Sequence, residues 1–291
     1  KVMSFSLGVI DIIAFANYKY VKGGESMDDL KKITYKNNFL SQVVVRIDFL
    51  QFIPNESAFS ADIEKSILKV FPRKGKDQII RFNSVNLTFD AAHLGVPNAN
   101  GQIYEGIQRE YLAQEENNKL ILSNKFIVFE INQYDTFGTH MQWFRDILVS
   151  FFLQNRVTAI RTGIRYINLF DPEKIRLQKN FFASDIAATL VTKLPNDEHE
   201  MSLIRSMHMS EYRLPTMTLN FRYGMFNPEY PNVLRKNSFA LDYDCFTTDQ
   251  LESADEILRN LENGHQAIQY LFENAITDTM RKVMNGERLL R

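Results

Sequence analysis

The chain alternates between two hydrophobic periods, and it does so twice in the same order. Strand-like stretches repeat apolar residues at every second position, and helix-like stretches repeat them at every third or fourth position. The first half gives strand 43–52, helix 57–71, strands 78–89, 103–112 and 120–134, and helix 137–153. The second half gives strand 157–170, helix 181–191, strands 202–212, 216–223 and 238–246, and a long helix from residue 248. Each half therefore has the order β-α-β-β-β-α.

This repeated order predicts an α+β fold made of two tandem units, residues 27–155 and 156–291. Two local matches support a duplication: VVVRIDFLQFIP resembles GIRYINLFDP, and SNKFIVFEINQY resembles KNSFALDYDCF. We expect each unit to be an antiparallel sheet covered by a long helix. A pseudo-twofold axis would relate the two units and leave a groove between them.

Residues 1–26 differ from the rest and are predicted to be a translated leader or a disordered extension. The segment from Lys22 to Met27 can be encoded by AAA GGA GGA GAA AGT ATG, which contains a bacterial ribosome-binding sequence before a start codon. A signal peptide is the alternative, because an apolar run extends from Phe5 to Phe15. Asp11 interrupts that run, so we favour a start at Met27.

The overall charge gives no electrostatic reason to expect nucleic acid or an anionic membrane as a partner. Lys and Arg number 34 against 35 for Asp and Glu, a net charge of −1, and 45% of the residues are hydrophobic. The single cysteine, Cys245, excludes an internal disulfide and any multi-cysteine metal site. This usage fits a reducing compartment, and we expect a cytoplasmic protein.

The stretch 157–170 carries the densest chemistry. Period-two alternation places Arg161, Gly163 and Arg165 on one face of this strand, and Ile164 and Tyr166 on the other. The two arginines can converge over Gly163 on one anionic group. Alternatively, each arginine pairs with a carboxylate on a neighbouring strand, because an unpaired buried charge is costly. The carboxylates that could serve are Asp48, Glu130, Asp242 and Asp244.

No catalytic signature occurs in the sequence, and we expect neither a metal nor a cofactor. Of the five histidines, His265 interests us most, because it interrupts the apolar stripe of the last helix. A buried imidazole needs hydrogen-bond partners, so His265 either completes a hydrogen bond in the core or faces a cavity. The segment from Asp197 to Glu200 could attract a metal, but a solvated charge cluster is the simpler interpretation.

The stretch Thr216–Tyr223, with Arg222, interleaves aromatic and basic residues. Proteins that bind single-stranded nucleic acid use this mixture for stacking. An aromatic strand packed beneath a helix is the commoner explanation of this pattern, and the net charge weighs against nucleic acid.

The motif R-x-G-[IL]-R-Y-x-N, here Arg161 to Asn168, resembles the core of a sporadically distributed bacterial family of conserved, functionally uncharacterised proteins. Phe71-Pro72-Arg73 and the segment from Phe272 to Thr277 are looser matches, and the resemblance extends from Tyr35 to Val283. It implies a start near Met27 and an important central strand, and it supplies no catalytic residue or cofactor.

The sequence favours a non-enzymatic binding or interaction protein with an anion-accepting groove between the two units. Its partner would be a small anionic ligand or another protein, and no membrane is expected. The predicted ligand-binding residues are Arg161, Gly163, Arg165, Tyr166 and Asn168. The alternative is an enzyme acting on a phosphorylated or carboxylated small molecule, with Arg165 as anion clamp and His265 as acid–base residue. Single-stranded nucleic acid binding is a third interpretation.

Overall fold

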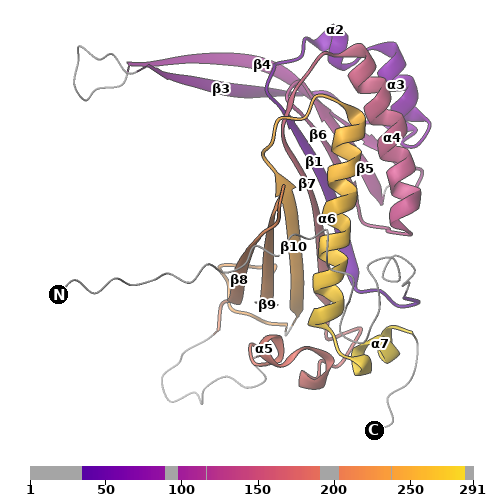
Figure 1. Cartoon of the computed structure of the whole chain (residues 1–291), viewed down its shortest axis with the longest axis vertical. Helices are drawn as coiled ribbons and strands as arrows, with labels where there is room; N and C mark the ends of the chain where they lie inside the picture. The colour runs from indigo at the N-terminus through magenta and orange to yellow at the C-terminus, as the bar shows by residue number, and fades with distance from the viewer. Residues whose placement is uncertain (1–34, 89–97, 116, 191–202, 237, 286–291) are drawn as a thin grey trace, which may run out of the picture.

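The fold is described from a computed structural model, shown in Figure 1. The structure describes residues 35–88, 98–115, 117–190, 203–236 and 238–285. Our predictions for residues 1–26 and for the segment from Asp197 to Glu200 lie outside this part of the chain.

The strands form one antiparallel sheet. Its order is β2-β4-β5-β6-β1-β7-β10-β9-β8, with β3 paired to β4 as a long hairpin that projects from the body (Figure 1). The strands are β1 (Leu40–Phe49), β2 (Arg73–Lys74), β3 (Gln78–Thr88), β4 (Asn98–Leu112), β5 (Asn118–Ser123), β6 (Phe126–Ile131), β7 (Ala159–Phe170), β8 (Ser206–Arg213), β9 (Thr218–Met225) and β10 (Phe239–Thr247). The predicted α+β class with antiparallel pairing is confirmed.

The two halves of the chain meet in the middle of this sheet. Strands β1 and β7, each the first strand of its half, pair side by side, with Val45 opposite Ile164 and Val43 opposite Tyr166. The two expected sheets are thus joined edge to edge. Val43, Val45 and Ile47 of β1 lie on the same face as Ile164 and Tyr166 of β7, so the pairing extends one apolar layer across both halves.

The long helices cover one face of the sheet, as Figure 1 shows. Helix α4 follows β6, helix α6 follows β10, and the two contact each other. Their apolar stripes bury the core against β1, β6, β7 and β10. The helices are α2 (Asn55–Ala58), α3 (Ala61–Leu68), α4 (Phe137–Gln154), α5 (Ser184–Ala187), α6 (Ala254–Ala275) and α7 (Asp278–Met284), with a 3-10 turn at Lys179–Phe181.

Three helix predictions differ from the structure in their bounds. The helix expected at 57–71 is two short helices, α2 and α3, and Ser60 precedes the longer one. The helix expected at 181–191 is reduced to α5. The last helix begins at Ala254, because Ser253 and Glu256 form a capping box there.

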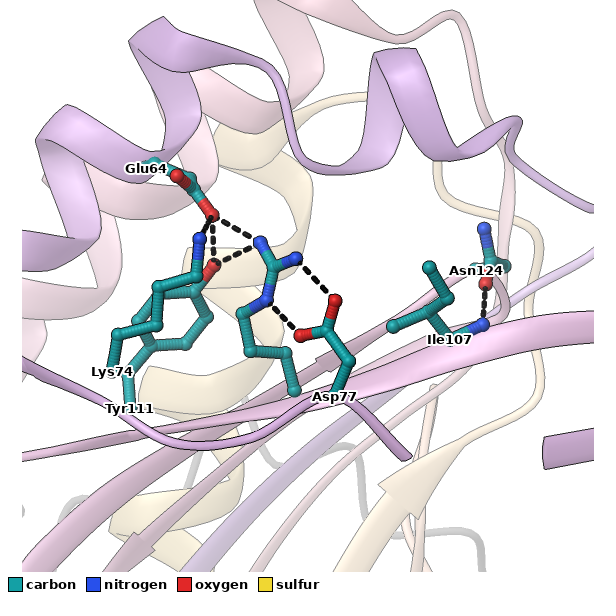
Figure 2. Close-up of polar contacts among 7 residues, drawn as sticks. Glu64, Lys74, Asp77, Ile107, Tyr111 and Asn124 are labelled. Atoms are coloured by element: carbon teal, nitrogen blue, oxygen red, sulfur yellow. Dashed lines mark hydrogen bonds and ion pairs between the residues drawn. The ribbon is translucent and has the colours of Figure 1, made fainter. Parts of the chain in front are cut away.

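A polar cluster fixes the base of the β3–β4 hairpin to helix α3. Arg109 of β4 is 9% exposed, bonds both oxygens of Asp77 at 2.5 and 2.7 Å, and also contacts Glu64. Figure 2 shows the Glu64 carboxylate reaching from α3 toward Lys74 and the Tyr111 hydroxyl, which donates to it at 2.9 Å. This cluster holds opposite charges together where the hairpin leaves the sheet.

Asn124 forms a second set of hydrogen bonds at the base of the β3–β4 hairpin. Its side-chain oxygen accepts from the Ile107 N–H at 2.6 Å, as Figure 2 shows, and its amide donates to the Ile53 carbonyl at 2.7 Å. A side chain at Gly106 would place its Cβ 2.5 Å from the Asn124 oxygen, so only glycine fits there. The hairpin, the β5–β6 turn and the segment before α2 are thereby linked.

Candidate functional site

The central strand β7 divides the predicted site residues between two faces of the sheet. Arg161, Gly163 and Arg165 lie on the face that none of the described helices covers, while Tyr166 and Asn168 lie on the helix-covered face. The five predicted ligand-binding residues therefore do not meet at one point.

On the open face, both arginines pair with carboxylates of β10. Arg165 donates to the two oxygens of Asp242 at 2.7 and 2.8 Å, and Arg222 of β9 lies 2.9 Å from the same carboxylate. Arg161 lies 3.6 Å from Asp244. The carboxylate-pairing alternative thus describes both arginines, and an added anion would have to compete with Asp242 and Asp244.

The space above Gly163 is occupied rather than open. A Cβ built at Gly163 would lie 2.9 Å from Cβ of Phe246 and 3.6 Å from the Arg161 guanidinium. The Arg161 guanidinium itself stacks over the Phe246 ring, 4.7 Å from its centroid. Glycine is needed here so that β10 can place Phe246 against β7.

On the helix-covered face, a cavity of about 500 Å³ lies between β7, the start of α4 and the middle of α6. Three predicted residues line it: Tyr166 and Asn168 from β7, and His265 from α6. A second hollow, of about 630 Å³, is lined by residues such as Lys36, Asp171 and Lys174 and contains none of the predicted site residues. The cavity beside His265 is therefore the candidate site.

The polar centre of this cavity is a chain of three side chains. The Tyr166 hydroxyl lies 2.9 Å from Nδ1 of His265 and 3.3 Å from the Tyr134 hydroxyl. Phe137 stacks on the imidazole of His265, with ring centroids 3.9 Å apart and an interplanar angle of 11°. His265 thus faces a cavity, as one of the two sequence interpretations proposed, and its ring orientation is fixed from two sides.

Gly264 brings His265 close to Tyr166. A Cβ at Gly264 would lie 2.9 Å from Cγ2 of Ile164 and 3.3 Å from Cε of Met217, so α6 approaches the sheet closely only because this residue lacks a side chain. Helix α6 runs without a break through Gly264 (Figure 1). The capping box at Ser253 fixes where the helix starts and hence which residue faces the cavity.

The tyrosines of the cavity are hydrogen-bond donors at neutral pH. Burial raises the pKa of Tyr166 well above its ordinary value, and the neighbouring Tyr134 adds to this rise. Burial also raises the pKa of Tyr134 to about 12. Both phenols remain protonated, so they can donate to a ligand or to His265, but neither can act as a general base near pH 7.

The charged residues that line the cavity are acidic. Asp135 and Glu262 are exposed, while Glu273 is buried and bonds the Tyr35 hydroxyl and Arg281. Among the described residues that line the cavity, there is no lysine or arginine. The lining therefore disfavours an anion and accepts a neutral or cationic ligand.

The sequence interpretation missed most of this lining. Tyr134 lies in the segment after β6, Phe137 is the first residue of α4, and Tyr35 precedes β1. These residues are far apart in the sequence, and the fold brings them together beside His265. Thr136 is the N-cap of α4 and fixes where the helix starts, so the positions of Tyr134 and Phe137 are fixed with it. The aromatic residues on either side of this N-cap threonine are the sequence signal that could have identified them.

The part of the chain that the structure describes contains no group of three or more His, Cys, Asp or Glu side chains that could hold a metal ion. No helix within it is both long and apolar enough to span a membrane. Comparisons with family models, curated proteins and solved structures find no match.

Proposed function

We propose that this chain is a non-enzymatic binding protein and that its ligand occupies the cavity beneath α6. The observation that supports this most is the cavity itself, about 500 Å³ in volume, with His265 and Tyr166 hydrogen-bonded within it. Cavities of roughly 300–1,000 Å³ with an aromatic lining and a few fixed polar groups are typical of small-molecule sites. A cytoplasmic location remains part of this proposal, in keeping with one buried, reduced cysteine.

The cavity is a better site than the arginine pair of the open face. The Arg165 guanidinium already donates hydrogen bonds to the Asp242 carboxylate, and Phe246 covers Gly163. In the cavity, by contrast, the groups are fixed by the fold and surround open space. We therefore move the binding site from Arg161 and Arg165 to Tyr166, Asn168 and His265.

Methyl NMR tests the proposal directly, because Ile268 and Met284 line the cavity. The protein is labelled with ¹³C at Ile and Met methyl groups and titrated with choline, 3,3-dimethylbutan-1-ol and 3,3-dimethylbutanoate. These probes share a shape and differ in charge. We expect at least one of them, at the millimolar concentrations suited to its size, to shift the Ile268 and Met284 signals and leave the signal of Ile63, a buried residue of α3, unmoved.

Two variants at one position provide the control. Gly138 lines the cavity, and a Cβ there meets nothing closer than 4.0 Å. Gly138→Trp should fill the cavity and abolish the shifts, whereas Gly138→Ala should retain them. If no probe moves either methyl signal, or if Gly138→Trp responds as the wild type does, the cavity is not a binding site.

An enzyme acting on a small molecule is the second candidate, and the His265–Tyr166 hydrogen bond favours it. In that case His265 would accept a proton while Tyr166 donates one. His265→Gln should then keep the methyl shifts but stop conversion of any compound identified as ligand. Persistence of conversion in that variant would exclude His265 as the acid–base residue.

We further propose that the two halves arose by duplication and are related by a pseudo-twofold axis between β1 and β7. The strand order supports this, since β1-β6-β5-β4 runs outward on one side and β7-β10-β9-β8 on the other. Helices α4 and α6 follow the equivalent strands β6 and β10. On this proposal the cavity lies at the contact of the two equivalent helices.

A further inference from the structure

Several aromatic side chains line the cavity. Five rings besides the imidazole line it, those of Tyr35, Tyr134, Phe137, Tyr166 and Phe272. They come from five separate segments: the chain before β1, the turn after β6, the start of α4, strand β7 and helix α6. Aromatic rings on several sides of one space attract a cation through their negative faces.

The charged residues near these rings are acidic, so their charge is opposite to that of a cation. Asp135 and Glu262 line the cavity as exposed acidic residues, and Glu273, which pairs with Arg281, is a third. Asp135 comes directly after Tyr134 in the turn before α4, so an aromatic and an acidic residue of the same turn both line the cavity. A cation in the cavity would therefore lie near both aromatic rings and negative charge.

We propose that the ligand of this cavity is a small organic cation, an amine or a quaternary ammonium compound, bound by the aromatic rings and Asp135. This inference rests on the proposed function, because it names the ligand class of the same cavity. It departs from the anionic ligand expected from Arg161 and Arg165, which lie on the other face of the sheet. The amides of Asn168 and Gln266 provide polar contacts for the rest of the ligand.

The isosteric probes separate ligand class from the existence of the site. Choline and 3,3-dimethylbutan-1-ol differ in replacing a positively charged nitrogen by carbon, and 3,3-dimethylbutanoate carries a negative charge. Dissociation constants come from the Ile268 and Met284 methyl shifts. We expect choline to bind about tenfold more tightly than the alcohol, and the carboxylate to bind most weakly.

A charge-removing pair of variants tests the role of Asp135. Asp135→Asn should weaken choline binding by about threefold to fivefold and leave the affinity for the alcohol unchanged. Asp146→Asn is the matched control, since Asp146 is exposed on α4, the helix that follows Asp135, and does not line the cavity. It should change neither affinity.

The other possible results of these titrations each contradict one part of the proposal. If the alcohol binds as tightly as choline, or the carboxylate binds most tightly, the cation proposal is wrong while the cavity remains a ligand site. If Asp146→Asn weakens choline binding as much as Asp135→Asn does, the effect is long-range and Asp135 does not contact the cation. If no probe shifts the methyl signals, the proposed function itself fails.

Discussion

At the scale of single residues, the alternation of strand β7 places adjacent side chains in two different environments. Arg165 and Tyr166 are adjacent in β7, yet one belongs to the open face and the other to the cavity. Strand alternation predicts that separation. It does not predict that Asp242 faces Arg165, because the register between β7 and β10 is set by the long-range pairing of the whole sheet.

Asp242 should contribute more to stability than either of the arginines it binds. Asp242→Ala leaves two partly buried cations, Arg165 and Arg222, without their carboxylate, whereas Arg165→Ala leaves Asp242 still paired with Arg222. Because both arginines are about one-third exposed, we expect a loss of about 2 kcal/mol for Asp242→Ala and about 1 kcal/mol for Arg165→Ala in urea unfolding. Glu173→Ala, in an exposed pair, should cost nothing measurable. Equal losses for all three variants would contradict this assignment.

His140 should make the fold less stable in mild acid. Burial lowers the pKa of its imidazole from 6.5 to about 4, and the Asp135 carboxylate offsets only part of this effect. The unfolded chain binds a proton as the pH falls through 6.5, whereas the folded protein does so only near pH 4. Stability should therefore decrease across this window by about 2 kcal/mol as the pH falls, and this loss should be absent in His140→Phe.

The comparison for this prediction is His208→Phe, which alters an exposed histidine on β8. It should show the same pH dependence as the wild type in urea unfolding measured from pH 7 to pH 4. If His140→Phe also keeps the wild-type dependence, His140 does not carry the depressed pKa.

At the scale of elements, hydrophobic periodicity predicted α4 and the central strand closely, and it predicted the junctions less well. The run 137–153 is apolar enough to identify α4, and its N-cap Thr136 fixes its start. The start of helix α3 could not be predicted, because Phe59 and Ser60 are both compatible with a continuous helix. The backbone conformation at these two residues separates α2 from α3. Likewise, a glycine within a helical pattern, such as Gly264, is a common position for a kink, while its role here depends on contacts with β7.

Gly264→Ala tests that role. Alanine should favour the helix by about 1 kcal/mol, but its Cβ would meet the rigid Cγ2 of Ile164 at 2.9 Å, and overpacking of this kind costs about 1–3 kcal/mol. We expect a net loss of about 1 kcal/mol in unfolding free energy and weaker probe binding, because His265 moves away from Tyr166. Asn263→Ala, at the adjacent exposed position, should be neutral or slightly stabilising. A stabilised Gly264→Ala protein would show that α6 does not need this close approach.

At the scale of the whole molecule, the predicted pair of units is one continuous sheet, so the halves should unfold together. The chain carries its own reporters, since Trp143 is the one tryptophan and Cys245 the one cysteine. Trp143 lies in α4 of the first half, and Cys245 is buried in β10 of the second. We expect Trp143 fluorescence and Cys245 thiol labelling to follow one urea transition with the same midpoint. Labelling of Cys245 at lower urea than the fluorescence change would show two independently folding units.

The strand order of that sheet could be predicted only in part. The sequence gives the succession of strands in each half, but nothing local in β1 or β7 states that they pair with each other. The cavity depends on that pairing and on the α4–α6 contact. Together they bring the side chains of Tyr134, Tyr166 and His265 close enough to form hydrogen bonds. This is why three of its residues were singled out from the sequence while the cavity itself was not.

The position of the binding site is tested most directly by comparing two variants in one methyl NMR titration. Gly138→Trp fills the cavity, and Arg161→Ala removes one arginine of the open face while leaving the cavity lining unchanged. With choline as the probe and the Ile268 and Met284 signals as the readout, we predict that Gly138→Trp abolishes the shifts and Arg161→Ala retains them. Loss of the shifts in Arg161→Ala, with wild-type behaviour in Gly138→Trp, would contradict the assignment of the site to the cavity beneath α6.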